Sequence, residues 1–187
     1  APTPTMGGVA IALAAVLAFV AIAPHVNAGA TTSTWLAIPL AGIAMFVVGV
    51  LDDRLQLTPL AKLVSSLIIG AFLVFSLASR LDNPLPLTHT LVATIWFAGV
   101  CHAFNLLDNM DGLAATLAAI ACGYFAIDAA TEHKNNTVLV LALSLGLACV
   151  AFLPFNLRPG RKAAVFMGDS GSQVLGFGLA SLALASS

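Results

Sequence analysis

Seven long apolar segments divide this sequence of 187 residues. They cover residues 6–23, 35–51, 62–79, 88–107, 112–130, 137–154 and 170–187. Each is close to the ~20 residues that a helix needs to cross the ~30 Å hydrocarbon core of a bilayer. Helices are the default because lipid offers no partner to open backbone groups, and no segment alternates polar and apolar residues as a membrane β-strand does. We predict an all-α fold, a polytopic transmembrane helical bundle with about seven spanning segments.

Composition supports a membrane protein. Hydrophobic residues make up 60% of the sequence and charged residues only 8%, against about 25% charged in a typical soluble domain. The net charge of −1 leaves no basic face for nucleic acid, which we exclude as a partner. Cys101, Cys122 and Cys149 stand singly inside apolar runs, so we expect them to be packing residues. The chain is expected to form a single integral membrane domain over residues 1–187.

The distribution of basic residues predicts which loops face the cytoplasm. Loops that follow alternate segments lie on the same side of the membrane. One set of loops carries Arg54, Lys62, Arg158, Arg161 and Lys162, whereas the other carries only Arg80 and Lys134. Because cytoplasmic loops are enriched in Lys and Arg, the first set is predicted to be cytoplasmic. Three acidic motifs fall on that same side, at residues 51–54, 108–111 and 166–172. A single site could therefore gather them.

The motif AFNLLDNMDG, residues 103–112, is the richest in polar groups. Asp108 and Asp111 are three residues apart and would share a face if they lay on a helix. Two carboxylates at a membrane boundary are costly unless a cation accompanies them. Together with Asn105 and Asn109 they suit a metal, a sugar or a base edge, and they exceed what helix capping requires. His102, beside the motif, is interpreted as a packed or interfacial residue.

The motif LDDR, residues 51–54, places Asp52 and Asp53 at the end of an apolar segment. The pair could bind a cation or accept a proton, or it could simply end a helix in solvent. Because the C-terminus of a helix disfavours anions, the pair needs compensation, for which Arg54 is a candidate. Lys62 could reach a phosphate, but taken alone it is more typical of a lysine that flanks the membrane interface.

The motif FMGDSGS, residues 166–172, combines small residues with Asp169 at the start of the last apolar segment. The beginning of a helix offers N–H groups to phosphate, and glycines allow a ligand to approach the backbone. Asp169 would suit Mg²⁺, which prefers carboxylate and phosphate oxygens. A helix N-cap after a glycine turn is the simpler alternative.

Taken in order, PTMGG, LDDR, AFNLLDNMDGLA, FNLRP and FMGDSGS resemble the polyprenyl-phosphate N-acetylhexosamine-1-phosphate transferases. That family includes the phospho-MurNAc-pentapeptide translocase and the undecaprenyl-phosphate GlcNAc-1-phosphate transferases. The resemblance implies transfer of a sugar 1-phosphate from a UDP-sugar to a polyprenyl phosphate, with release of UMP. It further implies a Mg²⁺ cofactor, with Mn²⁺ as the alternative, a multi-pass protein of the plasma membrane with a cytoplasmic active site, and it leaves a homodimer open.

The resemblance also assigns roles to individual residues. Asp169 corresponds to the family's metal ligand, and Asp52 and Asp53 correspond to its paired catalytic aspartates. The other matching positions are implied to bind substrate: Lys62, Asn105, Asp108, Asp111 and Asn156. Gln173 departs from the family, which usually has an apolar residue there.

The resemblance leaves two functional alternatives open. PTMGG is typical of the muramoyl-pentapeptide branch, whereas FNLLDNMDG and FMGDSGS lean toward the GlcNAc-1-phosphate branch, which we favour. A secondary transporter is the alternative from another class, although its acids would lie near the midplane of the bilayer. Family members have roughly ten spanning helices, so we expect this chain with seven segments to be a fragment.

Overall fold

The computed structural model describes residues 4–22, 32–79 and 86–186, with the side chains of residues 32–36 excepted. Within these residues the chain forms seven helices and no strand. They are α1 (Gly7–Ile22), α2 (Thr32–Leu55), α3 (Pro59–Ala78), α4 (Leu87–Leu107), α5 (Leu113–Thr131), α6 (Asn136–Asn156) and α7 (Gly168–Ser186). The prediction of an all-α bundle with one helix for each apolar segment is confirmed.

Four of these helices, α3 to α6, are long and apolar enough to cross a membrane by length and composition. The described part of α1 is equally apolar but shorter, at 16 residues. Most helices extend beyond the apolar segments that predicted them, because their polar end turns remain helical. Helix α3 begins three residues early, where Thr58 caps the helix by accepting from Ala61 N and Pro59 occupies a first-turn position suited to proline.

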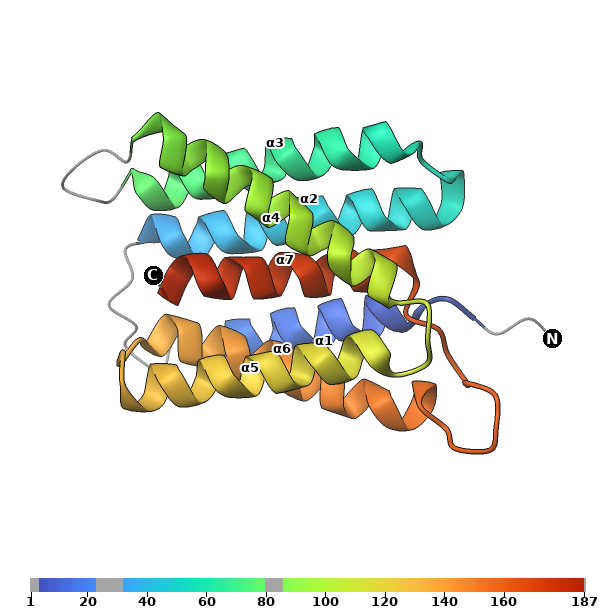
Figure 1. Cartoon of the computed structure of the whole chain (residues 1–187). Coiled ribbons are helices and arrows are strands. Elements are labelled where there is room, and N and C mark those ends of the chain that lie inside the picture. Colours follow the sequence, from blue (N-terminus) through green and yellow to red (C-terminus); the bar gives the residue numbers. More distant parts are fainter. Residues whose placement is uncertain (1–3, 23–31, 80–85, 187) are drawn as a thin grey trace.

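Helix α7 is the centre of the bundle. It lies between α2, α3 and α4 on one side and α1, α5 and α6 on the other (Figure 1). Every residue from Ser170 to Leu182 is buried. One hydrophobic cluster joins α7 to α1, α5 and α6, and a second joins it to α2, α3 and α4, where the Phe97 and Phe177 rings meet edge to face with centroids 5.9 Å apart. The middle of the bundle is therefore formed by the helix that also carries Asp169.

Small residues allow the other helices to approach α7 closely. A Cβ added at Gly176 would lie 2.5 Å from Cys101 Cα of α4, and one added at Gly171 would lie 2.7 Å from Gly8 Cα of α1. Such contacts are typical of helix packing in membranes, where small residues bring backbones together. Gly7 and Gly8 make contacts of the same kind, because a Cβ at Gly7 would lie 2.7 Å from Phe166 O and one at Gly8 would lie 2.5 Å from Gly171 Cα.

Consecutive helices run in opposite directions, so the connections alternate between the two ends of the bundle (Figure 1). The residues that precede α1 and the connections at 56–58, 108–112 and 157–167 share the end at the right of the figure. Asp128 Oδ1 and His133 Nδ1 form a hydrogen bond of 2.9 Å at the opposite end. The predicted grouping of the three acidic motifs at one end is confirmed. Arg80, which entered the topology argument, lies outside the described residues.

Candidate active site

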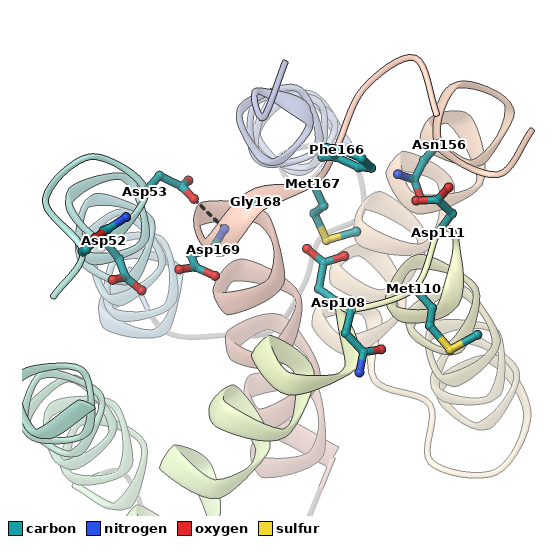
Figure 2. Close-up of a pocket in the computed structure, with 12 residues that line it drawn as sticks. Asp52, Asp53, Asp108, Met110, Asp111, Asn156, Phe166, Met167, Gly168 and Asp169 are labelled. Carbon is teal, nitrogen blue, oxygen red and sulfur yellow. Dashed lines mark hydrogen bonds between the residues drawn. The ribbon is translucent and has the colours of Figure 1, made fainter. Parts of the chain in front are cut away.

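A pocket of about 470 Å³ opens at the end of the bundle where the three acidic motifs meet (Figure 2). Helix α2 contributes two carboxylates to its wall, the connection after α4 contributes two, and the start of α7 contributes one. The lining residues are Asp52, Asp53, Gln56, Asp108, Asn109, Met110, Asp111, Asn156, Phe166, Met167, Gly168 and Asp169. Acids that lie far apart in the sequence are thus brought to one cavity.

Asp53 caps the N-terminus of α7 from the last turn of α2. Asp169 N donates to Asp53 Oδ1 at 2.7 Å (Figure 2). Ser170 N donates to Asp53 Oδ2 at 3.0 Å. Gly168 turns the chain into the helix with φ +77, and a Cβ at this position would lie 3.0 Å from Asp53 Oδ1. The first N–H groups of α7, expected to be offered to phosphate, are therefore bonded to protein in this structure.

Asp52 is buried and is paired with Lys62. Its side chain is only 1% exposed, its Oδ1 accepts from Leu57 N at 3.0 Å, and its Oδ2 forms an ion pair with Lys62 Nζ. The negative charge of the Asp52 carboxylate is therefore balanced by Lys62 of α3. Arg54, the candidate that the sequence suggested, is exposed and forms no ion pair within the described residues.

Lys62 and Asn105 hold the Asp169 carboxylate between α3 and α4. Lys62 Nζ lies 3.4 Å from Asp169 Oδ2, and Asn105 Nδ2 donates to Asp169 Oδ1 at 2.8 Å and to Ser172 Oγ at 3.0 Å. The interpretation of Lys62 as an interface-flanking lysine is wrong, because its ammonium group turns inward between two acids. Each oxygen of Asp169 thus has a donor from a different helix.

The segment PTMGG supports the start of α7. Phe166 N donates to Pro4 O at 2.9 Å, Gly7 N donates to Phe166 O at 3.0 Å, and Gly8 N donates to Met167 O at 2.8 Å. Two motifs from opposite ends of the chain therefore lie side by side through their backbones. This pairing fixes the chain immediately before Asp169.

Asn156 holds two connections together beneath the pocket. It is 4% exposed, its Oδ1 accepts from Gly112 N at 2.5 Å, and its Nδ2 donates to Val165 O at 2.9 Å. Gly112 has a φ of +75, which glycine adopts readily, and it ends the turn between α4 and α5. Asn156 lines the pocket as expected, yet both of its amide atoms are bonded to backbone. Its substrate-binding role stays a prediction.

Asp108 and Asp111 do not share a helical face, so that part of the sequence argument is wrong. Helix α4 ends at Leu107, and residues 108–112 form a turn before α5. Both acids nevertheless line the pocket. Burial, together with the neighbouring carboxylates Asp169, Asp53 and Asp111, raises the pKa of Asp108 to about 7. The pocket is thus a place where negative charge is crowded.

The described residues include no group of three or more His, Cys, Asp or Glu side chains that could hold a metal ion by themselves. Magnesium rarely uses such a cage, because it is usually bound by one or two carboxylates with substrate phosphates and water. Asp169 at the pocket wall and Asp108, which forms no ion pair within the described part of the chain, fit that donor set. The oxygen chemistry of the pocket thus accommodates a hard divalent cation.

Sequence reasoning missed part of the pocket. Gln56, Met110, Phe166 and Met167 line it without having been singled out. Gln56 follows the end of α2 with a φ of 51, unusual for a residue with a side chain. The sequence signal that could have identified Gln56 as a pocket residue was its position four residues, or about one helical turn, after Asp52. The apolar lining residues carry no signal of their own in a chain that is 60% hydrophobic.

Comparison with known proteins places these features in a family. The model of glycosyl transferase family 4 matches residues 35–187. The phospho-N-acetylmuramoyl-pentapeptide-transferase of Lactobacillus delbrueckii subsp. bulgaricus is 35% identical over 201 residues, covering 97% of this chain and 61% of the relative. A Bacillus subtilis protein named "Probable undecaprenyl-phosphate N-acetylglucosaminyl 1-phosphate transferase" is 33% identical over 198 residues, covering 97% and 51%.

A third relative, the phospho-N-acetylmuramoyl-pentapeptide-transferase of Geobacillus kaustophilus, is 34% identical over 202 residues. This chain spans 51 to 61% of the length of these three relatives. The family model covers the acidic motifs LDDR, NLLDNMDG and FMGDSGS, which meet at the pocket. The chain therefore belongs to glycosyl transferase family 4.

Proposed function

We propose that the protein transfers a sugar 1-phosphate of the N-acetylhexosamine type from a UDP-sugar to a polyprenyl phosphate and releases UMP. The observation that carries this proposal is the convergence of Asp52, Asp53, Asp108, Asp111 and Asp169 on one pocket at one end of the bundle. Relatives aligned over 97% of this chain are named as a phospho-N-acetylmuramoyl-pentapeptide-transferase and a probable undecaprenyl-phosphate N-acetylglucosaminyl 1-phosphate transferase, which supports the proposal. An opening at the end of an apolar bundle suits a reaction between a lipid and a water-soluble nucleotide.

A magnesium ion completes the proposed site, with Mn²⁺ as the alternative. Both reactants are anions, and a pocket lined by carboxylates would repel them without a cation. Asp169 and Asp108 are the residues that would hold it. When bound, the metal would neutralise the diphosphate of the donor and stabilise charge on the departing phosphate.

The residues of the chain supply positioning and charge around that metal. Lys62 and Asn105 hold Asp169 from two sides, so its carboxylate enters the reaction already oriented. Asp111, on the turn after α4, would face the nucleotide-sugar. Asp53 caps α7 but is exposed at the pocket, whereas Asp52 is buried and paired with Lys62, so Asp53 is the more accessible of the two to the lipid phosphate.

We further propose that the pocket faces the cytoplasm and that the protein resides in the plasma membrane. The basic residues Arg54, Arg158, Arg161 and Lys162 lie at the pocket end of the bundle, as the positive-inside rule requires for a cytoplasmic end. A nucleotide-sugar made in the cytoplasm would then reach the pocket directly.

The sugar donor is assigned to the GlcNAc type, with the muramoyl-pentapeptide donor as the second candidate. The motifs FNLLDNMDG and FMGDSGS favour the first, and the relatives named as pentapeptide transferases favour the second. A panel of UDP-sugars, each supplied with undecaprenyl phosphate, separates the two by the donor that yields UMP.

The test uses the protein in lipid nanodiscs with undecaprenyl phosphate and UDP-GlcNAc or UDP-MurNAc-pentapeptide. We expect UMP release that requires Mg²⁺, is lost in Asp169→Asn and persists in Asp128→Asn, an acid at the opposite end of the bundle. If the Asp169→Asn variant inserts into the membrane and keeps full turnover, Asp169 is not a metal ligand. A protein that releases no UMP from any donor but moves a solute across the membrane would be a transporter instead.

A further inference from the structure

A partly buried hydrogen bond joins α3 and α4 one helical turn from Lys62 and Asn105. Ser66 Oγ of α3 lies 3.1 Å from His102 Nε2 of α4. Ser66 is fully buried, and His102 is half-buried and does not line the pocket. The described residues contain no other side-chain hydrogen bond between these two helices. The expected role of His102 as a packed residue leaves this bond unexplained.

Helical register relates this bond to the residues that hold Asp169. Ser66 follows Lys62 by four residues on α3, and His102 precedes Asn105 by three on α4, so each pair shares a face one turn apart. Lys62 and Asn105 reach the two different oxygens of Asp169, at 3.4 and 2.8 Å. The orientation of the Asp169 carboxylate therefore depends on how α3 and α4 are placed relative to each other.

The proton of the Ser66–His102 bond can be assigned. Ser66 Oγ also lies 2.9 Å from Leu63 O, a carbonyl oxygen that can only accept. A hydroxyl group carries one proton. Both contacts are hydrogen bonds only if Ser66 donates to Leu63 O and His102 donates from Nε2 to Ser66. The neutral ring is then the Nε2–H tautomer.

We infer that His102 is a positioning residue of the active site: through Ser66 it fixes α4 against α3 one turn below Lys62 and Asn105, and so sets the orientation of Asp169. This inference rests on the proposed function, in which Asp169 must point at the reacting phosphates. Displacing a catalytic group by ~1 Å can cost about 100-fold in rate, so a bond outside the pocket can matter to turnover.

The first test reads the bond directly. In protein labelled with ¹⁵N-histidine and held in nanodiscs, long-range ¹H–¹⁵N correlation distinguishes the Nε2–H from the Nδ1–H tautomer. The sequence has four histidines, and the signal lost in His102→Gln identifies the relevant one. We expect the Nε2–H tautomer and a changed ¹⁵N shift in Ser66→Ala. The Nδ1–H tautomer, or a signal indifferent to Ser66→Ala, would overturn the inference.

The second test separates positioning from general packing. We expect His102→Leu and Ser66→Ala each to lower kcat about 10- to 100-fold with little change in the KM of the UDP-sugar. The double variant should have a kcat no lower than that of the less active single variant, because both substitutions remove the same bond. His102→Gln keeps a donor at the same reach and should restore most of kcat. If the losses in kcat are additive in the double variant, or if His102→Gln loses as much kcat as His102→Leu, the two residues contribute only packing and the inference is overturned.

Thr94→Val is the matched control, because Thr94 is a buried polar residue of α4 whose hydroxyl donates to Thr90 O within its own helix at 2.8 Å. It should leave kcat unchanged, and a loss equal to that of His102→Leu would overturn the inference. A protein that releases no UMP at all would refute the proposed function. An active protein with the Nδ1–H tautomer would refute only the role of His102.

Discussion

The cap that Asp53 places on α7 predicts a stability loss that can be worked out from its two hydrogen bonds. Asp53→Ala leaves the N–H groups of Asp169 and Ser170 without their acceptors. Water can replace the acceptor at the half-exposed Asp169, but Ser170 is only 1% exposed. Loss of an N-cap costs about 0.5–2 kcal/mol, and a buried unpaired N–H costs about 1–3 kcal/mol. We therefore expect Asp53→Ala to lower the free energy of unfolding by about 2 kcal/mol.

Asp53→Asn should cost about half as much, because one amide oxygen can still accept while the charge that favours a helix N-terminus is lost. The free energy of unfolding is measured by titrating SDS into mixed micelles, and amide hydrogen exchange follows the first turn of α7. Glu132→Ala, an exposed acid at the end of α5, is the control and should change stability by less than about 0.5 kcal/mol. If Asp53→Ala costs no more than the control, or the first turn of α7 keeps its protection, the capping argument fails.

Two further substitutions on α7, with a control on α4, test the packing of α7. Gln173→Leu should raise the free energy of unfolding by about 1 kcal/mol, because Gln173 is buried and its Nε2 has no hydrogen-bond partner among the described residues. A lower thermal midpoint than that of the unaltered protein would contradict this. Gly171→Ala should cost about 1–3 kcal/mol by overpacking, since the new Cβ would lie 2.7 Å from Gly8 Cα. In Gly99→Ala the new Cβ would meet no atom within 4 Å among the described residues, apart from its chain neighbours and the backbone of its own helix, so the same change should be neutral or gain about 0.5–1 kcal/mol. Equal midpoints for the two glycine variants would refute the close contact of α1 and α7.

The number and order of the helices could be predicted because lipid makes apolar length decisive. Each of the seven segments became a helix, and alternation of the connections correctly placed Asp52, Asp108 and Asp169 at one end. Neither inference needed the packing of one helix on another. The sequence is therefore sufficient to predict the features that depend on lipid as the solvent, namely the number, order and alternating direction of the helices.

The partners of the site residues could not be predicted, because they depend on contacts between distant parts of the chain. Nothing in LDDR indicates that Asp53 would cap a helix 116 residues later, or that Lys62 would turn inward to Asp52. The interpretation of Asp108 and Asp111 as sharing a helical face was wrong, because residues 108–112 form a turn that ends at Gly112 with a positive φ. Hydrophobic periodicity gives no indication of such a turn. A single histidine in an apolar run likewise gives no sign of a buried serine on the neighbouring helix.

The central place of α7 has a consequence for how the protein is made. Of the seven described helices it is the last to be synthesised, yet both halves of the bundle pack on it. The six described helices that precede it therefore cannot form the complete bundle until the seventh has been synthesised. Insertion of single helices and their later association are separable stages in membranes, and the packing of both halves on α7 belongs to the later one. A nascent chain that ends before Gly168 would hold most of the acids but no acid pocket closed by Asp169.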